Sequence, residues 1–212
     1  MFQSIEQRIK SSYNCLFKQS DWILFKEGAD NYLKIAALLK KRNINNSKLA
    51  LSGIKSDGRL LIRNTHKRLF IGIACELIIK AYYLKNGFCI NRVNGTNDIL
   101  LFEEINDLEV NSTETYTLNK FVQGLPQLER KCNKEKTDKD IITAITIGKV
   151  FRNKEAHIIT SGHKYSSGDY ETIENGISKI YKNWFDEDLD FKISFETGEK
   201  GKFELIRNIE AK

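Results

Sequence analysis

Three polar side chains that lie close together in the sequence could do chemistry: Arg152, Asn153 and His157. The guanidinium of Arg152 is a permanent cation that can hold a phosphate through two hydrogen bonds. The amide of Asn153 can donate and accept, and a histidine such as His157 can transfer a proton near neutral pH. Together these side chains have the chemistry to bind a phosphate and to move a proton beside it.

Helix geometry limits what this group can do alone. At about 100° per residue, Asn153 and His157 lie about 40° apart on one helix face. Arg152 and His157 are about 140° apart, so they do not meet on one straight helix. Either the helix ends between them, or another surface completes the site. A symmetric dimer that repeats the motif across a two-fold axis would supply that surface.

Basic residues continue on both sides of the motif. They could form a track for a phosphate backbone, although a solvated basic face is an equally good interpretation. A structural interpretation also exists for Arg152 and His157, because cations near a helix C-terminus are stabilised by the helix dipole. The residues of this basic track are Lys149, Lys154, His163 and Lys164.

The composition indicates a globular, mostly helical chain. Its 212 residues suffice for one domain with an appendage, and a single proline and 13 glycines leave long segments uninterrupted. The formal net charge of +6 is compatible with a polyanionic partner but does not require one. The most apolar run, residues 69–84, contains Glu76 and Lys80, which predicts a buried helix rather than a membrane span.

Cysteine usage and the N-terminal residues bear on the compartment. Residues 1–13 have no apolar core of the signal-peptide type. The four cysteines are scattered without a C-x-x-C pair, which argues against zinc and for reduced thiols in the cytoplasm. We therefore expect no metal and no cofactor. The cysteines are Cys15, Cys75, Cys89 and Cys132.

Apolar periodicity predicts an all-α antiparallel helical bundle over residues 1–187. Ser20 or Asp21 is expected to cap the second helix, and Gly87 to end the strongest one. Turn residues at Ser56-Asp57-Gly58 predict that residues 43–64 form a loop that can hold a short helix. The predicted helices cover residues 3–18, 21–42, 65–86, 117–132, 138–157 and 173–185.

Two segments fall outside this bundle. Residues 88–116 have the character of an insertion, in which Asn94-Gly95 predicts either a hairpin between residues 89–93 and 99–102 or a flexible loop. Alternating apolar residues in 188–212 predict a small C-terminal β-hairpin appendage.

The sequence resembles the HEPN superfamily in two places. The helix with Glu76-Leu77-Ile78-Ile79-Lys80-Ala81 is one, and Arg152-Asn153-x-x-x-His157 near the end of a later helix is the other. In helix order the resemblance covers roughly residues 20–187. It implies a helical bundle that forms a homodimer, with two motifs lining one cleft.

The resemblance also implies metal-independent cleavage of single-stranded RNA, in a toxin or an antiviral-defence effector with an antitoxin or defence-system partner. Arg152 would stabilise the charge on a phosphorane, His157 would transfer protons, and Asn153 would orient either the histidine or the phosphate. Some family members are controlled through a tyrosine two residues after the histidine. Ile159 stands there in this chain.

Two other functions compete with this one. The first is a HEPN-like scaffold that binds RNA or a protein and cleaves nothing. The second is a metal-dependent nuclease, which is disfavoured because no carboxylates cluster around the motif. Glu76 is expected to form a structural pair with Lys80, four residues later, rather than to take part in catalysis.

Overall fold

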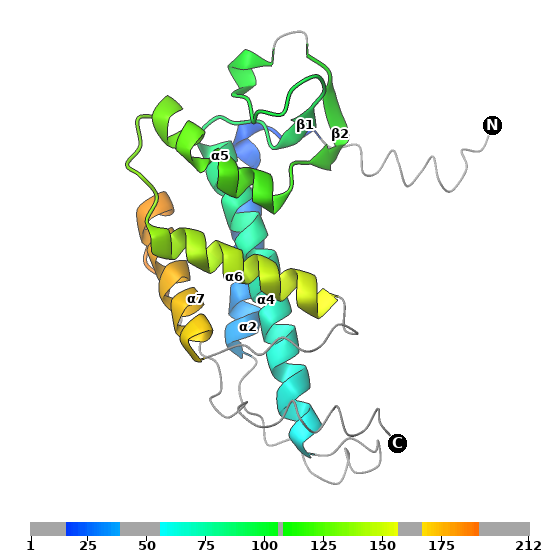
Figure 1. The fold of residues 1–212 in the computed structure, drawn as a ribbon, viewed down its shortest axis with the longest axis vertical. Coiled ribbons are helices and arrows are strands. Elements are labelled where there is room, and N and C mark those ends of the chain that lie inside the picture. The colour runs from blue at the N-terminus through cyan, green and yellow to red at the C-terminus, as the bar shows by residue number, and fades with distance from the viewer. Residues whose placement is uncertain (1–15, 39–55, 106–107, 157–166, 191–212) are drawn as a thin grey trace, which may run out of the picture. The chain divides into compact units, whose positions relative to one another are not determined.

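The computed structural model describes residues 16–38, 56–105, 108–156 and 167–190, within which the chain is mostly α-helical with a small two-stranded antiparallel sheet (Figure 1). The α-helices are α2 (Trp22–Leu38), α4 (Ser56–Lys85), α5 (Leu118–Lys131), α6 (Lys139–Ala156) and α7 (Ser167–Ile180). The strands are β1 (Asn91–Val93) and β2 (Val110–Thr115). Short turns of helix occur at Gln19–Asp21, Phe102–Glu104 and Tyr181–Phe185.

The chain divides into two compact units. The first, which we call the sheet unit, comprises Met1–Gly28 and Leu77–Asp138. The second, the motif unit, comprises Ala29–Glu76 and Lys139–Lys212. Helices α2 and α4 contribute residues to both units, whereas α5 belongs to the sheet unit and α6 and α7 belong to the motif unit.

In the sheet unit, the end of α4 is formed as the sequence predicts. Gly87 adopts a left-handed conformation with φ of 81°. Its N–H donates to the carbonyl of Leu84 at 2.9 Å, and the N–H of Phe88 donates to the carbonyl of Tyr83 at 3.0 Å. This is the hydrogen-bond pattern of a Schellman C-cap, and the rings of Tyr83 and Phe88 make the accompanying apolar contact at 5.6 Å.

The strands lie in the predicted insertion, but the pairing differs from a simple hairpin. The turn at Asn94-Gly95 is present, with φ of 81° at Gly95. The ladder partner of β1 is β2, with Val93 opposite Val110. Residues 99–102 meet the chain just before β1, where Phe88 and Leu101 form an isolated antiparallel bridge and the N–H of Cys89 donates to the carbonyl of Leu100 at 2.9 Å. The Tyr116 side chain connects the neighbouring Asp98 to β1.

Tyr116 makes that connection through its hydroxyl. The hydroxyl donates to the carbonyl of Asp98 at 2.9 Å and accepts the N–H of Val93 at 3.2 Å. Its partners are distant in sequence, so local turn chemistry does not reveal them.

Helix α5 confirms the prediction for residues 117–132. The Thr117 hydroxyl caps it by accepting the N–H of Lys120 at 3.3 Å. Pro126 lies inside the helix. The buried face consists of apolar residues at helical spacing: Leu118, Phe121, Leu125 and Leu128.

The N-terminal predictions need correction. Residues 16–18 are not helical, and the N–H of Phe17 donates to Asn91 Oδ1 at 3.1 Å instead. Asp21 does not act as the N-cap. Its carboxylate reaches back to the N–H of Lys18 at 2.8 Å from the third position of the turn that precedes α2. Residues 1–15 and the predicted helix end at 40–42 lie outside the described residues.

Helix α4 begins at Ser56, well before the predicted start at residue 65, so the prediction of a loop through residue 64 is wrong at its C-terminal end. Serine and aspartate are favoured in turns and also in the first turn of a helix, which explains the error at Ser56-Asp57. The C-terminal hairpin was predicted for residues 188–212. Residues 188–190 contain no strand, and residues 191–212 lie outside the described residues.

In the motif unit, α6 and α7 lie side by side (Figure 1). Gly176 of α7 faces Ala144 of α6, where an added Cβ would also lie 3.0 Å from the carbonyl of Asp140. Lys179 of α7 forms an ion pair with the Asp140 carboxylate. Over the described part of the chain, no helix has the length and apolarity needed to cross a membrane.

Candidate functional site

Helix α6 carries the first two residues of the motif. It extends from Lys139 to Ala156, so it continues for a full turn beyond Arg152. Ala156 is the last described residue before His157, so neither a helix that ends between Arg152 and His157 nor a site completed by another surface is tested here. Arg152 is half-buried and Asn153 is exposed.

The remaining predicted residues are placed as follows. Lys149 is half-buried on α6, one turn before Asn153. Lys154 lies within α6, but its side chain is outside the described part of the structure. His157, His163 and Lys164 also lie outside the described residues. The structure thus leaves the partnership of Arg152 with His157 untested.

Helices α4 and α6 cross each other (Figure 1), and two glycines lie where the helices approach most closely. A Cβ added to Gly72 of α4 would lie 2.6 Å from the Arg152 backbone nitrogen and 2.6 Å from the Gly148 carbonyl oxygen. A Cβ added to Gly148 of α6 would lie 2.5 Å from Cys75 Sγ. Only glycine fits at both positions, so the crossing holds this part of α6 at a fixed distance from α4.

An ion pair forms at the edge of this crossing, between Arg152 Nη1 and Glu76 Oε2. Glu76 lies one turn after Gly72 on α4, and Arg152 lies one turn after Gly148 on α6, so the glycine contact places the two side chains opposite each other. The Glu76 side chain is 17% exposed and that of Arg152 is 41% exposed. Among the described residues, Glu76 is the one partner of the Arg152 guanidinium.

Sequence reasoning did not predict this pair. The spacing of four residues on one helix predicts a pair of Glu76 with Lys80, and this stays a prediction. Glu76 and Arg152 are 76 residues apart, so no local spacing indicates their pair. A signal was nevertheless present. Gly72 and Gly148 stand four positions before Glu76 and Arg152, so each glycine shares a helix face with one member of the pair.

Buried groups around the crossing anchor α6 from inside. Phe151, next to Arg152, is fully buried and its ring lies 6.1 Å from that of Tyr170. The Tyr170 hydroxyl accepts a hydrogen bond from Arg68 Nη1 at 3.0 Å. Burial raises the pKa of the Cys75 thiol to about 12, so this thiol stays protonated at neutral pH and is not a nucleophile.

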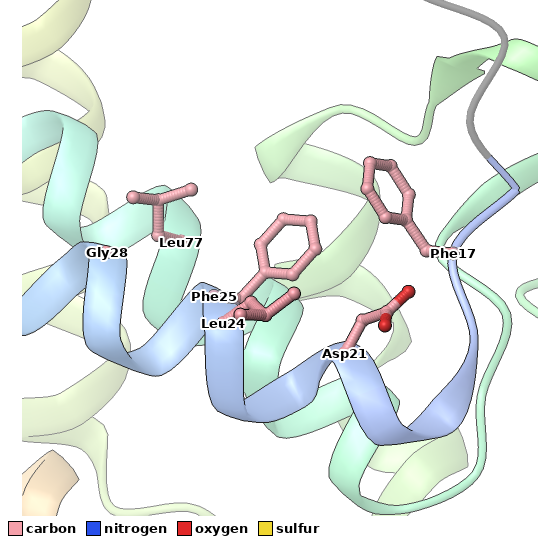
Figure 2. Close-up of a pocket in the computed structure, with 6 residues that line it drawn as sticks. All are labelled: Phe17, Asp21, Leu24, Phe25, Gly28 and Leu77. Atoms are coloured by element: carbon pink, nitrogen blue, oxygen red, sulfur yellow. The ribbon is translucent and has the colours of Figure 1, made fainter.

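The sheet unit contains a cavity of about 340 Å³ that the sequence motifs did not indicate. Figure 2 shows its lining, in which Phe17 and Phe25 meet edge to face at 4.9 Å. Its single carboxylate, that of Asp21, already accepts the N–H of Lys18. The cavity could hold an apolar group, but its lining offers no pair of groups for acid–base chemistry. The lining residues are Phe17, Asp21, Leu24, Phe25, Gly28 and Leu77.

Within the described ranges, no three histidine, cysteine, aspartate or glutamate side chains gather where a metal ion could be held. Comparisons of the chain with protein-family models, with curated proteins and with solved structures found no match.

Proposed function

We propose that the protein is a metal-independent endoribonuclease that cleaves single-stranded RNA, built on a HEPN-like helical bundle. The observation that supports this best is the state of Arg152. Its guanidinium is held on one side by Glu76, is 41% exposed, and keeps its other N–H donors without a protein partner among the described residues. An oriented, accessible guanidinium with open donors is suited to a phosphodiester.

In the proposed reaction, the 2′-hydroxyl of the RNA attacks the adjacent phosphorus. Arg152 donates to the phosphorane oxygens as negative charge accumulates on them. The imidazole of His157 transfers the protons, which removes one from the 2′-hydroxyl and delivers one to the departing 5′-oxygen. Asn153 orients the phosphate or the imidazole. The products are a 2′,3′-cyclic phosphate and a 5′-hydroxyl.

The site is proposed to be shared by two copies of the chain. The described part of α6 ends at Ala156. If His157 continues this helix, it lies about 140° from Arg152 and cannot serve the same phosphate within one copy. A second copy related by a two-fold axis supplies the missing partner to each motif. Lys149, Lys154, His163 and Lys164 would guide the RNA strand towards this cleft. A toxin or defence effector acting on cytoplasmic RNA, held in check by a partner protein, fits such an enzyme.

The test uses the purified full chain, single-stranded RNA and EDTA. We expect cleavage to persist in the chelator and to fall by about 10²-fold or more in Arg152→Ala and in His157→Ala. A substrate with a 2′-deoxy residue at the cut position should stay intact, because it lacks the nucleophile. Asp140→Asn serves as the matched control, since it also removes half of an ion pair on α6.

Two results would overturn the proposed activity, and a third would overturn the shared site. RNA that is bound but left intact by the wild-type protein would favour the non-catalytic scaffold. Cleavage that survives both substitutions would assign the activity to other residues or to a contaminant. Sedimentation analysis that finds only a monomer at the concentrations of the assay would reject the shared site.

A further inference from the structure

The ion pair between Glu76 and Arg152 is asymmetric in its surroundings. The Glu76 side chain is 17% exposed, whereas the Arg152 side chain is 41% exposed. The Glu76 carboxylate is therefore the more buried member of the pair, and the Arg152 guanidinium is the more exposed one. Because Glu76 stands one turn from the Gly72 contact with the Arg152 backbone, both the backbone and the tip of Arg152 are held by α4.

The geometry of the hydrogen bond leaves part of the guanidinium for a ligand. Arginine has five N–H donors in a planar fork. Glu76 engages Nη1, and no other described residue bonds to this side chain. The donors on Nη2 and Nε are left to bind two oxygens of one phosphate, the bidentate arrangement that arginine favours.

We propose that Glu76 is the positioning residue of the ribonuclease site, an inference that rests on the proposed ribonuclease activity. Its carboxylate holds the Arg152 guanidinium in one orientation, so that the Nε–Nη2 edge faces the scissile phosphodiester before RNA arrives. Glu76 itself does not touch the RNA. Without it the arginine side chain samples several rotamers, and the fraction of bound RNA that is correctly aligned falls.

This role predicts a particular split between kinetic constants. A carboxylate beside the site repels the RNA phosphate, so its removal should leave KM unchanged or lower. The loss of orientation should lower kcat, by about 10- to 100-fold in Glu76→Gln. Glu76→Asp, which keeps the charge on a shorter side chain, should recover part of kcat. Asp140→Asn should leave kcat within about twofold of the wild type, because exposed ion pairs contribute little.

A double-mutant cycle separates positioning from a direct role. Glu76→Ala is measured in the wild-type chain and in the Arg152→Ala chain, with the folded fraction of each variant checked by circular dichroism. If Glu76 acts through Arg152, its removal has no further effect on cleavage once Arg152 is absent. An equal loss in both backgrounds would overturn the proposal, because Glu76 would then act on the RNA or on the fold. Full kcat in Glu76→Gln would overturn it as well.

A measurement without RNA keeps this inference distinct from the ribonuclease proposal. In ¹⁵N-labelled protein, the side-chain N–H signals of Arg152, assigned by their absence in Arg152→Ala, should be resolved in the wild type and broadened or averaged in Glu76→Gln. Signals that are the same in both proteins would show that Glu76 does not immobilise the guanidinium. A wild type that leaves RNA intact removes the ribonuclease proposal, and a positioning role in RNA cleavage falls with it. The NMR comparison then decides only whether Glu76 holds Arg152.

Discussion

Each unit contains a helix contact mediated by glycine, and the two contacts differ in what the glycine meets. In the motif unit, Gly72 faces backbone atoms of Gly148 and Arg152, at 2.6 Å from an added Cβ. In the sheet unit, Gly124 of α5 faces the hydroxyl of Tyr83, at 2.7 Å from an added Cβ. Backbone atoms cannot move aside without displacing the helix, whereas a side-chain atom can be removed or turned.

Two phenols of the sheet unit and the Arg152 guanidinium of the motif unit use their hydrogen-bonding groups differently. In the sheet unit, the Tyr83 hydroxyl donates to the Phe121 carbonyl at 2.6 Å, and the Tyr116 hydroxyl joins the Asp98 carbonyl to β1. Burial raises the pKa of both phenols. In the motif unit, the Arg152 guanidinium is held at one edge while the remaining donors stay available.

For this reason we propose that the cleavage reaction takes place in the motif unit. Polar groups that complete the internal hydrogen bonding of a fold stabilise it, and they are not free to bind a ligand. A backbone crossing that needs no polar group for its own packing can present a charged side chain at its edge. The prediction that follows from this comparison is that the two glycine contacts respond differently to the same substitution.

The largest effect is expected for Gly72→Ala. The added methyl group would meet two backbone atoms at 2.6 Å, so α4 and α6 must separate. We expect the free energy of unfolding to fall by about 3 kcal/mol, at the upper end of the cost of overpacking. Denaturant unfolding measures this directly.

The matched control is Gly28→Ala in α2, where the new methyl group would lie 3.4 Å from Leu77 Cδ1, an ordinary contact distance. This substitution should stabilise the protein by up to about 1 kcal/mol, because alanine favours helix more than glycine does. Equal effects at the two positions would mean that the crossing of α4 and α6 is not as close as described.

A smaller loss of stability is expected at the sheet-unit contact, and a second substitution should relieve part of it. Gly124→Ala places a methyl group 2.7 Å from the Tyr83 hydroxyl oxygen, so we expect a loss of about 1 to 2 kcal/mol. Tyr83→Phe removes that oxygen at a cost of about 1 kcal/mol, from the lost hydrogen bond to Phe121. The double variant should lose about 1 kcal/mol less unfolding free energy than the sum of the two single losses. Simple additivity, measured by the same unfolding curves, would contradict the contact.

Features that depend on neighbouring residues were predictable from the sequence. The start and buried face of α5 followed from Thr117 and the spacing of Leu118, Phe121, Leu125 and Leu128. The Gly87 C-cap followed from the one residue type that adopts positive φ without strain. Both depend on interactions within about one turn of the chain, where residue type decides conformation.

Features that depend on distant residues were not predictable. The ladder partner of β1 is β2, and the Tyr116 hydroxyl bonds to Val93 and Asp98, which are 23 and 18 residues away in the sequence. The ion pair of Glu76 with Arg152 forms because two glycines allow α4 and α6 to cross closely. In the candidate site, Arg152 and Asn153 are predicted from their types and spacing and stay predictions. The pair of Glu76 with Arg152 was not predictable, because periodicity describes one helix at a time.

The smallest effect, when it is measured near pH 10, concerns the phenols of the sheet unit. Burial, followed by the charges of Glu129 and Cys132, raises the pKa of Tyr82 to about 12. In the unfolded chain a tyrosine ionises near pH 10, so above that pH the unfolded state loses a proton that the folded state keeps. The free energy of unfolding should therefore be constant below pH 10 with respect to this group. It should fall between pH 10 and 12, by no more than about 1.4 kcal/mol per pH unit for one proton.

Tyr82→Phe should make the fall in unfolding free energy above pH 10 shallower by the contribution of one tyrosine proton. The contributions of Tyr83 and Tyr181 should remain, because burial also raises their pKa values. Urea unfolding at pH 9, 10 and 11 measures the slopes of the wild type and the variant. Tyr32→Phe, in the motif unit, is a control for the substitution itself. If the wild type and Tyr82→Phe lose stability at the same rate above pH 10, the Tyr82 hydroxyl ionises in the folded protein as readily as in the unfolded chain. The sheet unit would then be more open to water around α4 than its buried phenols indicate.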